Sequence, residues 1–357
     1  MNEKHGPITH TGEKYPSPRR ELDYLPIEPP SAGRATEVVP GLHWARIPLP
    51  MEPTHINVWL MEEGDGWTLV DTGMALDPCR EAWHSLERDV LGGRRLCRIF
   101  VTHDHPDHMG LATWLERRHG AEVWMSAASH ESVTAFLAAE PAAIEERMRG
   151  FLSAHGMAVE QGPARGTALR PDLWFDGAPA LAHAPVDGET FVAGGRDWRI
   201  IETGGHCRGH LCLHDPAGGL LVSGDQVLPT ISPNVSVISA RPEADPLREF
   251  LASLGRLEAC AEDTIVLPSH GRPFRGLHGR LADVRDHHLR QLEELRRVCA
   301  EPRTAYDLLP VLFGRPLRGF HRVLAMGETV AHLNYLRSSG ALERRERADG
   351  VLEFVAA

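Results

Sequence analysis

The sequence lacks the long apolar segments that mark membrane and secreted proteins. It contains no run of 18 apolar residues, and its polar N-terminus has no hydrophobic stretch like that of a signal peptide. Cysteine is scarce as well: six occur in 357 residues, none in a Cys-x-x-Cys pair, as is usual for reduced intracellular thiols. We therefore expect a cytoplasmic protein that does not associate with membranes.

Positive charge is also scarce. The 38 Lys and Arg residues stand against 49 Asp and Glu residues, and the resulting net charge of −11 counts against a general nucleic-acid-binding protein. Hydrophobic residues make up 42% of the chain, as in folded globular proteins, and the length favours one large domain with a smaller one. We expect a small-molecule substrate, with nucleic acid bound only if a local basic patch exists.

Histidine, in contrast, is abundant, and part of it is concentrated in one stretch. The chain has 21 His, and residues 101–110 contain the pattern His-x-His-x-Asp-His. The residues of this pattern are His103, His105, Asp107 and His108. An apolar run at residues 96–101 predicts a buried strand before them, and residues 109–119 have helical spacing. So many imidazole and charged groups on one strand–helix turn indicate a metal site, because a metal ion would satisfy them.

Three further metal-binding side chains follow predicted strands. Strands at residues 198–202, 219–223 and 264–267 each end in a turn of small residues that carries one such side chain. These side chains are His206, Asp225 and His270. A glycine in such a turn lets the backbone bend sharply and approach a metal ion closely. A single histidine after a strand is usually a hydrogen-bonded surface residue, but the series together with the first cluster indicates one metal centre.

The rest of the pattern alternates short strands with helices. Residues 1–37 are rich in proline and charge and predict an extended N-terminal arm. Further strands are predicted at 42–49, 56–61, 67–70, 121–125, 189–192 and 210–214, and further helices at 77–91, 246–260 and 277–298. Residues 127–170 predict helices that either cover the substrate or only pack on the fold. Both interpretations stay open.

The composition shifts again near residue 299. Residues 304–312 and 320–338 have helical spacing, and residues 342–347 and 351–355 predict a hairpin closed by an Asp-Gly turn. Helices followed by a hairpin outline a small winged-helix module. From residue 299 this segment carries 8 Arg and 7 acidic residues, so it lacks the basic charge of a nucleic-acid-binding wing. We interpret it as an element for packing or for forming a homodimer.

On these residues the chain resembles the metallo-β-lactamase superfamily, an α/β fold in which an αββα sandwich of two mixed sheets carries outer helices. The resemblance implies an arm, a catalytic domain and a winged-helix-like domain, bounded by 1–37, 38–298 and 299–357. It implies that one metal ion is held by His103, His105 and His206, and the second by Asp107, His108 and His270. Asp225 would bridge the two ions, and Asp71, in an Asp-Thr-Gly turn, would orient a ligand histidine.

The resemblance also implies the chemistry. Two divalent ions lower the pKa of a bridging water, and the resulting hydroxide attacks a carbonyl or phosphorus centre. Asp107 and Asp225 would be the catalytic carboxylates. Zinc is the metal we expect first, although the same ligands accept iron or manganese. Asp225 is typical of the glyoxalase II group, whereas many true β-lactamases of the superfamily have Cys at that position. We therefore expect a hydrolase of ester-like bonds, with thioesters as first choice and lactones as second.

Two other functions stay open. The C-terminal segment and residues 224–234 resemble a β-lactamase-like endoribonuclease, which would make the protein a metal-dependent phosphodiesterase. Alternatively, the metal domain senses a ligand and the wing binds DNA, as in a regulator. The net charge of −11 and the nearly neutral tail count against both.

Three residues directly after His206 need separate interpretation. Arg208 and His210 flank the same turn and are candidates for contacting an anionic substrate. Cys207 stands beside the ligand, but we interpret it as a small buried hydrophobic residue. A hydroxide nucleophile needs no side-chain nucleophile, so Cys207 should be dispensable for catalysis.

Overall fold

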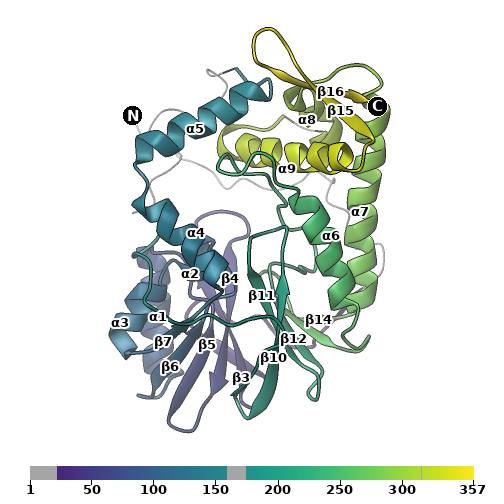
Figure 1. The fold of residues 1–357 in the computed structure, drawn as a ribbon. Helices are drawn as coiled ribbons and strands as arrows, with labels where there is room; N and C mark the ends of the chain where they lie inside the picture. Colours follow the sequence, from purple (N-terminus) through teal and green to yellow (C-terminus); the bar gives the residue numbers. More distant parts are fainter. Residues whose placement is uncertain (1–21, 159–173, 315) are drawn as a thin grey trace.

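The computed structural model of the protein describes residues 22–158, 174–314 and 316–357. Two seven-stranded sheets pack face to face and carry helices on their outer faces, as Figure 1 shows. The strand order is β2-β3-β4-β5-β6-β7-β8 in the first sheet and β1-β14-β13-β12-β11-β10-β9 in the second. Each sheet contains both parallel and antiparallel pairs. The predicted fold class, an αββα sandwich of two mixed sheets, is confirmed.

The N-terminal half of the chain builds the first sheet. Its strands are β2 Ala35–Val39, β3 Leu42–Pro48, β4 His55–Glu62, β5 Gly66–Val70, β6 Arg95–Phe100, β7 Glu122–Trp124 and β8 Leu181–His183. The helices of this half are α1 Asp77–Asp89, α2 Pro106–Met109, α3 Ala112–His119, α4 Ala127–Ala138 and α5 Pro141–Ala154. Helices α1 and α3 bury Trp83, Leu86 and Leu115 in an apolar cluster with the outer face of this sheet. The helical period predicted for residues 77–91 therefore reflects one face packed on a sheet.

The second sheet is built mainly from the C-terminal half. Its strands are β1 Asp23–Tyr24, β9 Thr190–Ala193, β10 Arg196–Thr203, β11 His210–Asp215, β12 Leu220–Gly224, β13 Ile265–Pro268 and β14 Phe274–Arg275. Helices α6 Pro246–Leu257 and α7 Leu277–Val298 cover its outer face. Strand β1 pairs with β14, so residues 22–37 of the predicted arm contribute β1 and most of β2 to the sandwich. The arm's earlier residues lie outside the described range.

Large apolar side chains hold the two sheets together. The cluster between the sheets contains three tryptophans, Trp44, Trp59 and Trp198, none more than 1% exposed. Alternate residues of each central strand point into this cluster and the others point toward the helices, as the pleat of a strand requires. Both faces of the central strands are thus buried, which explains why they read as short continuous apolar runs.

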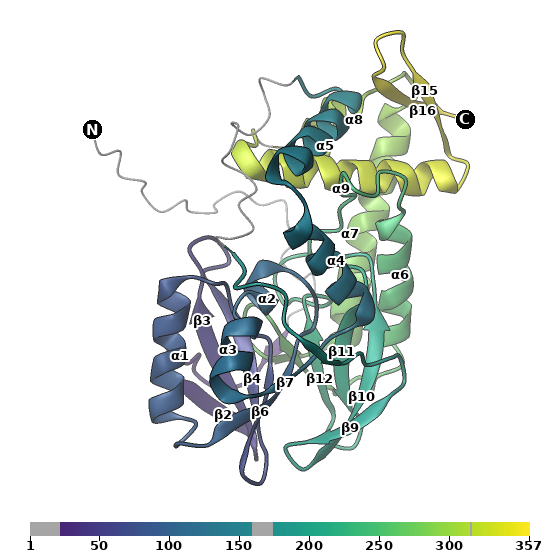
Figure 2. The same cartoon turned by 60° about the vertical axis from the view of Figure 1, so that its left-hand side comes forward.

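The C-terminal segment lies over one end of the sandwich (Figures 1 and 2). It consists of helices α8 Ala305–Phe313 and α9 Gly319–Ser338 and the hairpin β15 Leu342–Glu346 and β16 Leu352–Ala356. The predicted helices and hairpin are present, whereas their identity as a winged helix stays a prediction. Buried Leu308 and Leu333 share one apolar cluster with α6, α7 and Phe151 of α5. Helix α5 therefore packs on this segment, and residues 159–170 of the predicted covering insertion lie outside the described range.

The helix predicted at residues 109–119 differs from the structure. Residues 109–119 form the end of α2 and a separate helix α3 rather than one continuous helix. A Cβ on Gly110 would lie 2.5 Å from the Trp174 carbonyl oxygen and 2.8 Å from that of Gly73. The Leu111 N–H is bonded to the Gly73 carbonyl at 3.0 Å. The chain bends because it packs against the Asp-Thr-Gly turn, a tertiary contact that helical spacing does not show.

None of the helices in the described parts of the chain is long and apolar enough to cross a membrane.

Candidate metal centre

The carboxyl ends of four strands bring all seven predicted ligands to one place. Strand β6 leads into the His-x-His-x-Asp-His turn, and β10, β12 and β13 lead to His206, Asp225 and His270. Strand β6 belongs to the first sheet and the other three to the second, so the centre lies where both sheets end. The ligand atoms form two groups, each within 4.8 Å: His103, His105, His206 and Asp225, and Asp107, His108 and His270.

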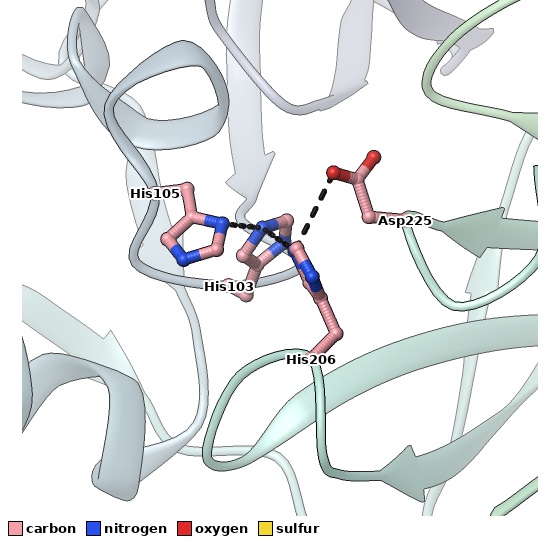
Figure 3. A group of neighbouring side chains, drawn as sticks. All are labelled: His103, His105, His206 and Asp225. Carbon is pink, nitrogen blue, oxygen red and sulfur yellow. Dashed lines mark hydrogen bonds and ion pairs between the residues drawn. The ribbon is translucent and has the colours of Figure 1, made fainter. Parts of the chain in front are cut away.

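The first group has the spacing of ligands around one cation (Figure 3). His103 Nε2 lies 2.9 Å from His105 Nδ1 and 3.2 Å from His206 Nε2. Asp225 Oδ2 lies 3.4 Å from His206 Nε2. Nitrogens bound to one tetrahedral zinc ion at about 2.0–2.1 Å lie about 3.3 Å from each other. The three imidazoles and the carboxylate therefore converge as a metal ion requires.

The second group meets the first at Asp225. The Oδ1 atom of Asp225 lies 3.5 Å from His108 Nε2 and also 3.5 Å from His270 Nε2, whereas Oδ2 faces the first group. Asp107 Oδ2 lies 3.3 Å from His270 Nε2 and 3.6 Å from His108 Nε2. Each carboxylate oxygen of Asp225 thus faces one group, which is the geometry of a bridging ligand.

Asp71 holds one of these histidines in place from outside the two groups. Its carboxylate lies 2.8 Å from His108 Nδ1 and accepts hydrogen bonds from the backbone N–H and the hydroxyl of Thr102. The residue has a φ of 60°, a left-handed conformation that Asp tolerates better than most residues. Because a carboxylate accepts the Nδ1 proton, the His108 Nε2 lone pair faces the second group. This is the orienting contact expected of Asp71.

Two further histidines are oriented by backbone carbonyls. His206 Nδ1 donates to the carbonyl of Asn234, and His270 Nδ1 donates to the carbonyl of His55, each at 2.8 Å. Both contacts leave the Nε2 lone pair toward the ligand groups. The roles of Asn234 and His55 have no sequence signature, because any residue supplies a carbonyl and only the folded chain shows where it points.

Two buried atoms of the centre have no hydrogen-bond partner among the residues that the structure describes. His108 Nε2 and Asp225 Oδ1 are buried without a hydrogen bond. An unpaired buried polar atom costs about 1–3 kcal/mol. Both atoms face the same group, so one divalent cation would satisfy them together. A donor set of imidazole nitrogens and carboxylate oxygens suits zinc, iron and manganese. The residues present therefore fit a metal centre.

The ionisation of three of the ligands agrees with this interpretation. Burial raises the pKa of Asp107, but the charges of His108 and His270 outweigh it and lower that pKa to about 2. Burial and the charge of His105 lower the pKa of His206 to about 4. Burial likewise holds the pKa of His103 well below its ordinary value. Near neutral pH the carboxylate is ionised and these two rings are neutral, the forms that bind metals. At His108 and His270 burial lowers the pKa, but the charges of Asp225 and Asp107 outweigh it and raise the pKa, so metal binding there would release a proton.

Comparison with known proteins assigns the family. Residues 51–270 match the family described as the metallo-beta-lactamase superfamily, and residues 292–357 match the metallo-beta-lactamase-like C-terminal domain. The chain belongs to the metallo-beta-lactamase superfamily. A beta-lactamase domain protein from Burkholderia ambifaria, known from its crystal structure, is 39% identical. The match covers 94% of this chain and 98% of the Burkholderia protein, with a TM-score of 0.87.

Two curated relatives are more distant. The hydroxyacylglutathione hydrolase of Rhizobium johnstonii is 25% identical over 225 residues, which are 62% of this chain and 67% of that protein. An acyl-coenzyme A thioesterase of Homo sapiens is 25% identical over 195 residues, which are 52% of this chain and 63% of that protein. The matches thus cover about two thirds of each relative.

The two predicted substrate contacts differ in their placement. His210 is fully buried, with Nε2 accepting from the Asp225 backbone N–H at 3.2 Å and Nδ1 2.8 Å from the Thr203 hydroxyl. Both ring nitrogens are occupied, so His210 supports the turn that carries Asp225. The expectation that it contacts a substrate is corrected. Arg208 is exposed and pairs with Glu131 at 3.1 Å, and its contact with a substrate stays a prediction.

The thiol of Cys207 is hydrogen-bonded and protonated. It donates to Asp104 Oδ1, and it points to that carboxylate rather than forming part of either ligand group. Burial and the negative charge of Asp104 raise the pKa of Cys207 well above its ordinary value. A protonated thiol is a poor nucleophile. Cys207 is half-buried and hydrogen-bonded rather than a buried hydrophobic residue, and its dispensability for catalysis stays a prediction.

Proposed function

We propose that this metal-dependent hydrolase cleaves thioesters at a centre of two divalent ions, with zinc as the expected metal. The observation that carries the proposal is Asp225, with one carboxylate oxygen toward each ligand group. The relatives support the choice of substrate: one is named a hydroxyacylglutathione hydrolase and another an acyl-coenzyme A thioesterase. Both names describe removal of an acyl group from a thiol carrier.

The ligand residues would be shared between the two ions as follows. His103, His105 and His206 would hold one ion, and Asp107, His108 and His270 the other. Asp225 would join the two, and its charge and that of Asp107 would compensate the cations in a buried site. When bound, the ions would supply a water of lowered pKa and polarise the scissile carbonyl. No residue has to act as a covalent nucleophile.

Lactones are the second class of substrate that such a centre suits, because the attacked carbonyl is similar. A metal-dependent phosphodiesterase, such as an endoribonuclease, remains the alternative. The nearly neutral C-terminal segment favours a small substrate over RNA, and it counts in the same way against a DNA-binding regulator.

Metal analysis followed by a substrate screen on the same sample tests the proposal. We expect two equivalents of metal per chain, and faster hydrolysis of an acyl-coenzyme A or hydroxyacylglutathione than of a lactone or bis-p-nitrophenyl phosphate. At most one equivalent in the fully loaded protein would refute the binuclear centre. A clear preference for the phosphodiester would refute the thioesterase and support the nuclease.

A further inference from the structure

The segment between β12 and α6 is attached to α9 of the C-terminal segment (Figures 1 and 2). The Val237 N–H donates to the Gly327 carbonyl at 3.0 Å, and the Ser236 hydroxyl donates to the Leu324 carbonyl at 3.2 Å. The approach is close: a Cβ on Gly327 would lie 2.7 Å from the Val237 carbonyl oxygen. Farther along, Asn334 Nδ2 donates to the carbonyls of Pro242 and Ala244 at 3.0 and 2.8 Å. The helix thus touches this segment at several points.

Asn234 lies in the same segment and connects α9 to the metal centre. Its carbonyl accepts from His206 Nδ1 at 2.8 Å. Its side chain is held at both ends: Nδ2 donates to Glu328 Oε2 at 3.4 Å, and Oδ1 accepts from the Ser236 hydroxyl. Glu328 is only 5% exposed, so it is not a surface charge that happens to lie nearby.

Helix α7 fixes the start of the segment independently. Arg280, which is 1% exposed, donates through Nε to the Leu228 carbonyl at 2.6 Å and through a second nitrogen to the Ile231 carbonyl at 2.7 Å. The part that leads from Asp225 is therefore held by α7. The part that carries Asn234 is held by α9, which is supplied by the C-terminal segment.

We propose that α9 positions the metal ligand His206 through Asn234, so that the C-terminal segment helps to build the metal centre. The inference rests on the proposed metal role of His206. The Asn234 carbonyl keeps the proton on Nδ1 and the ring at its angle, and the contacts to Gly327 and Glu328 keep that carbonyl in place. Outer partners of ligand histidines commonly change metal affinity by about 10- to 100-fold. Glu328 and Gly327 are positioning residues and contact no substrate.

Four variants of the full-length protein test this inference, with metal affinity measured by competition against a chromophoric chelator. Gly327→Ala adds a methyl group that pushes the segment away from α9. Asn234→Ala removes both side-chain contacts but keeps the carbonyl. Glu328→Gln is conservative, since an amide oxygen still accepts from Asn234. Gly255→Ala in α6 is the matched control, because a Cβ there meets nothing within 4 Å.

We expect Gly327→Ala and Asn234→Ala each to bind one of two zinc equivalents about tenfold more weakly, at the low end of the usual effect of outer partners. Both variants should bind the second equivalent with the affinity of the parent protein. Glu328→Gln and Gly255→Ala should bind both equivalents with the parental affinity. Parental affinity for both equivalents in folded Asn234→Ala, or equal weakening of both, would overturn the inference. If Gly327→Ala does not fold, Asn234→Ala decides. Because metal binding is measured, a protein that fails to cleave thioesters would refute the proposed function and not this inference.

Discussion

At the scale of single residues, the centre is distinguished by which atoms have partners. Asp225 Oδ1 and His108 Nε2 are buried without a hydrogen bond, whereas the thiol of Cys207 is bonded to Asp104. Buried atoms that form no hydrogen bond within the described part of the chain are available to a metal ion. The thiol of Cys207 belongs to neither ligand group, although Cys207 follows a ligand directly in the sequence.

The first prediction contrasts these two residues. Asp225→Ala should lower kcat/KM by at least about 10²-fold, because the ligands of both groups lose the carboxylate that faces them. Cys207→Ala should keep most of the activity, and thiol-alkylating reagents should inhibit the metal-loaded protein only weakly. Steady-state kinetics with metal analysis of each variant checks this. An acylated Cys207 trapped by mass spectrometry during turnover would contradict it, as would an Asp225→Ala variant with two metals and a normal rate.

The second prediction concerns the glycine that precedes His206. Gly205 has a φ of 94°, and a Cβ there would lie 2.4 Å from the Pro246 carbonyl oxygen. Gly195 is the matched control: its φ is 67°, but its Cβ would meet nothing within 4 Å. Gly195→Ala should cost about 1–2 kcal/mol of unfolding free energy for its left-handed backbone. Gly205→Ala should cost about 1–3 kcal/mol more from the clash, and should weaken metal binding. Equal losses in urea unfolding would show that close packing at Gly205 is unimportant.

At the scale of elements, α9 buries several polar side chains. Glu328, Thr329, His332 and Asn334 are all at most 5% exposed. Two of them, Glu328 and Asn334, bind the segment that leads to the metal centre, and His332 contacts His288 of α7 at 3.1 Å. Helix α9 therefore binds the segment between β12 and α6 as well as packing in the apolar cluster with α6 and α7.

The third prediction follows from the burial of Glu328, which raises its pKa from 4.5 to about 8. Between these values the folded protein keeps a proton that the unfolded chain releases, so the unfolding free energy should fall as pH rises from about 5 to 8. Glu328→Gln, which cannot ionise, should remove this part of the pH dependence, on the order of a few kcal/mol. Urea unfolding of metal-free protein at several pH values tests it. Parallel curves for parent and variant would contradict the raised pKa.

At the scale of the whole molecule, the C-terminal segment is not a separately packed unit in the part of the chain that the structure describes. Leu308 and Leu333 belong to one apolar cluster with Leu254 of α6 and Leu295 of α7. Separate domains bury their own cores, whereas here one core is shared across the predicted boundary at residue 299.

The fourth prediction is that deleting residues 301–357 changes solubility or oligomeric state, because it exposes the faces of α6 and α7 that the segment covers. Light scattering and size-exclusion chromatography measure the effect. RNA affinity should be the same before and after the deletion, since the removed segment is nearly neutral. Salt-sensitive RNA binding that disappears with the segment would instead support the endoribonuclease.

Much of the protein could be predicted from the sequence because its signals are local. The apolar runs, their alternation with helical spacing and the glycine-containing turns depend on neighbouring residues only, and they predicted most strands and helices within a few positions. The order of His, Asp and His after successive predicted strands, together with the first cluster, indicated one metal centre, and the family resemblance assigned the ligands to two ions. Asp71 was assigned through the family resemblance, from its Asp-Thr-Gly turn.

What only the tertiary structure decided depends on contacts between distant residues and on backbone atoms. Nothing in the sequence shows that each oxygen of Asp225 faces a different ligand group. Nor does it show that both ring nitrogens of His210 are hydrogen-bonded, one to the Thr203 hydroxyl and the other to the Asp225 N–H. The carbonyl of Asn234 has no sequence signature, since every residue has one. The buried side of α9 could not be read from helical periodicity, because its polar residues are buried by partners about 90 residues away, as Glu328 is by Asn234. Long-range packing, rather than local preference, connects the C-terminal segment to the metal centre.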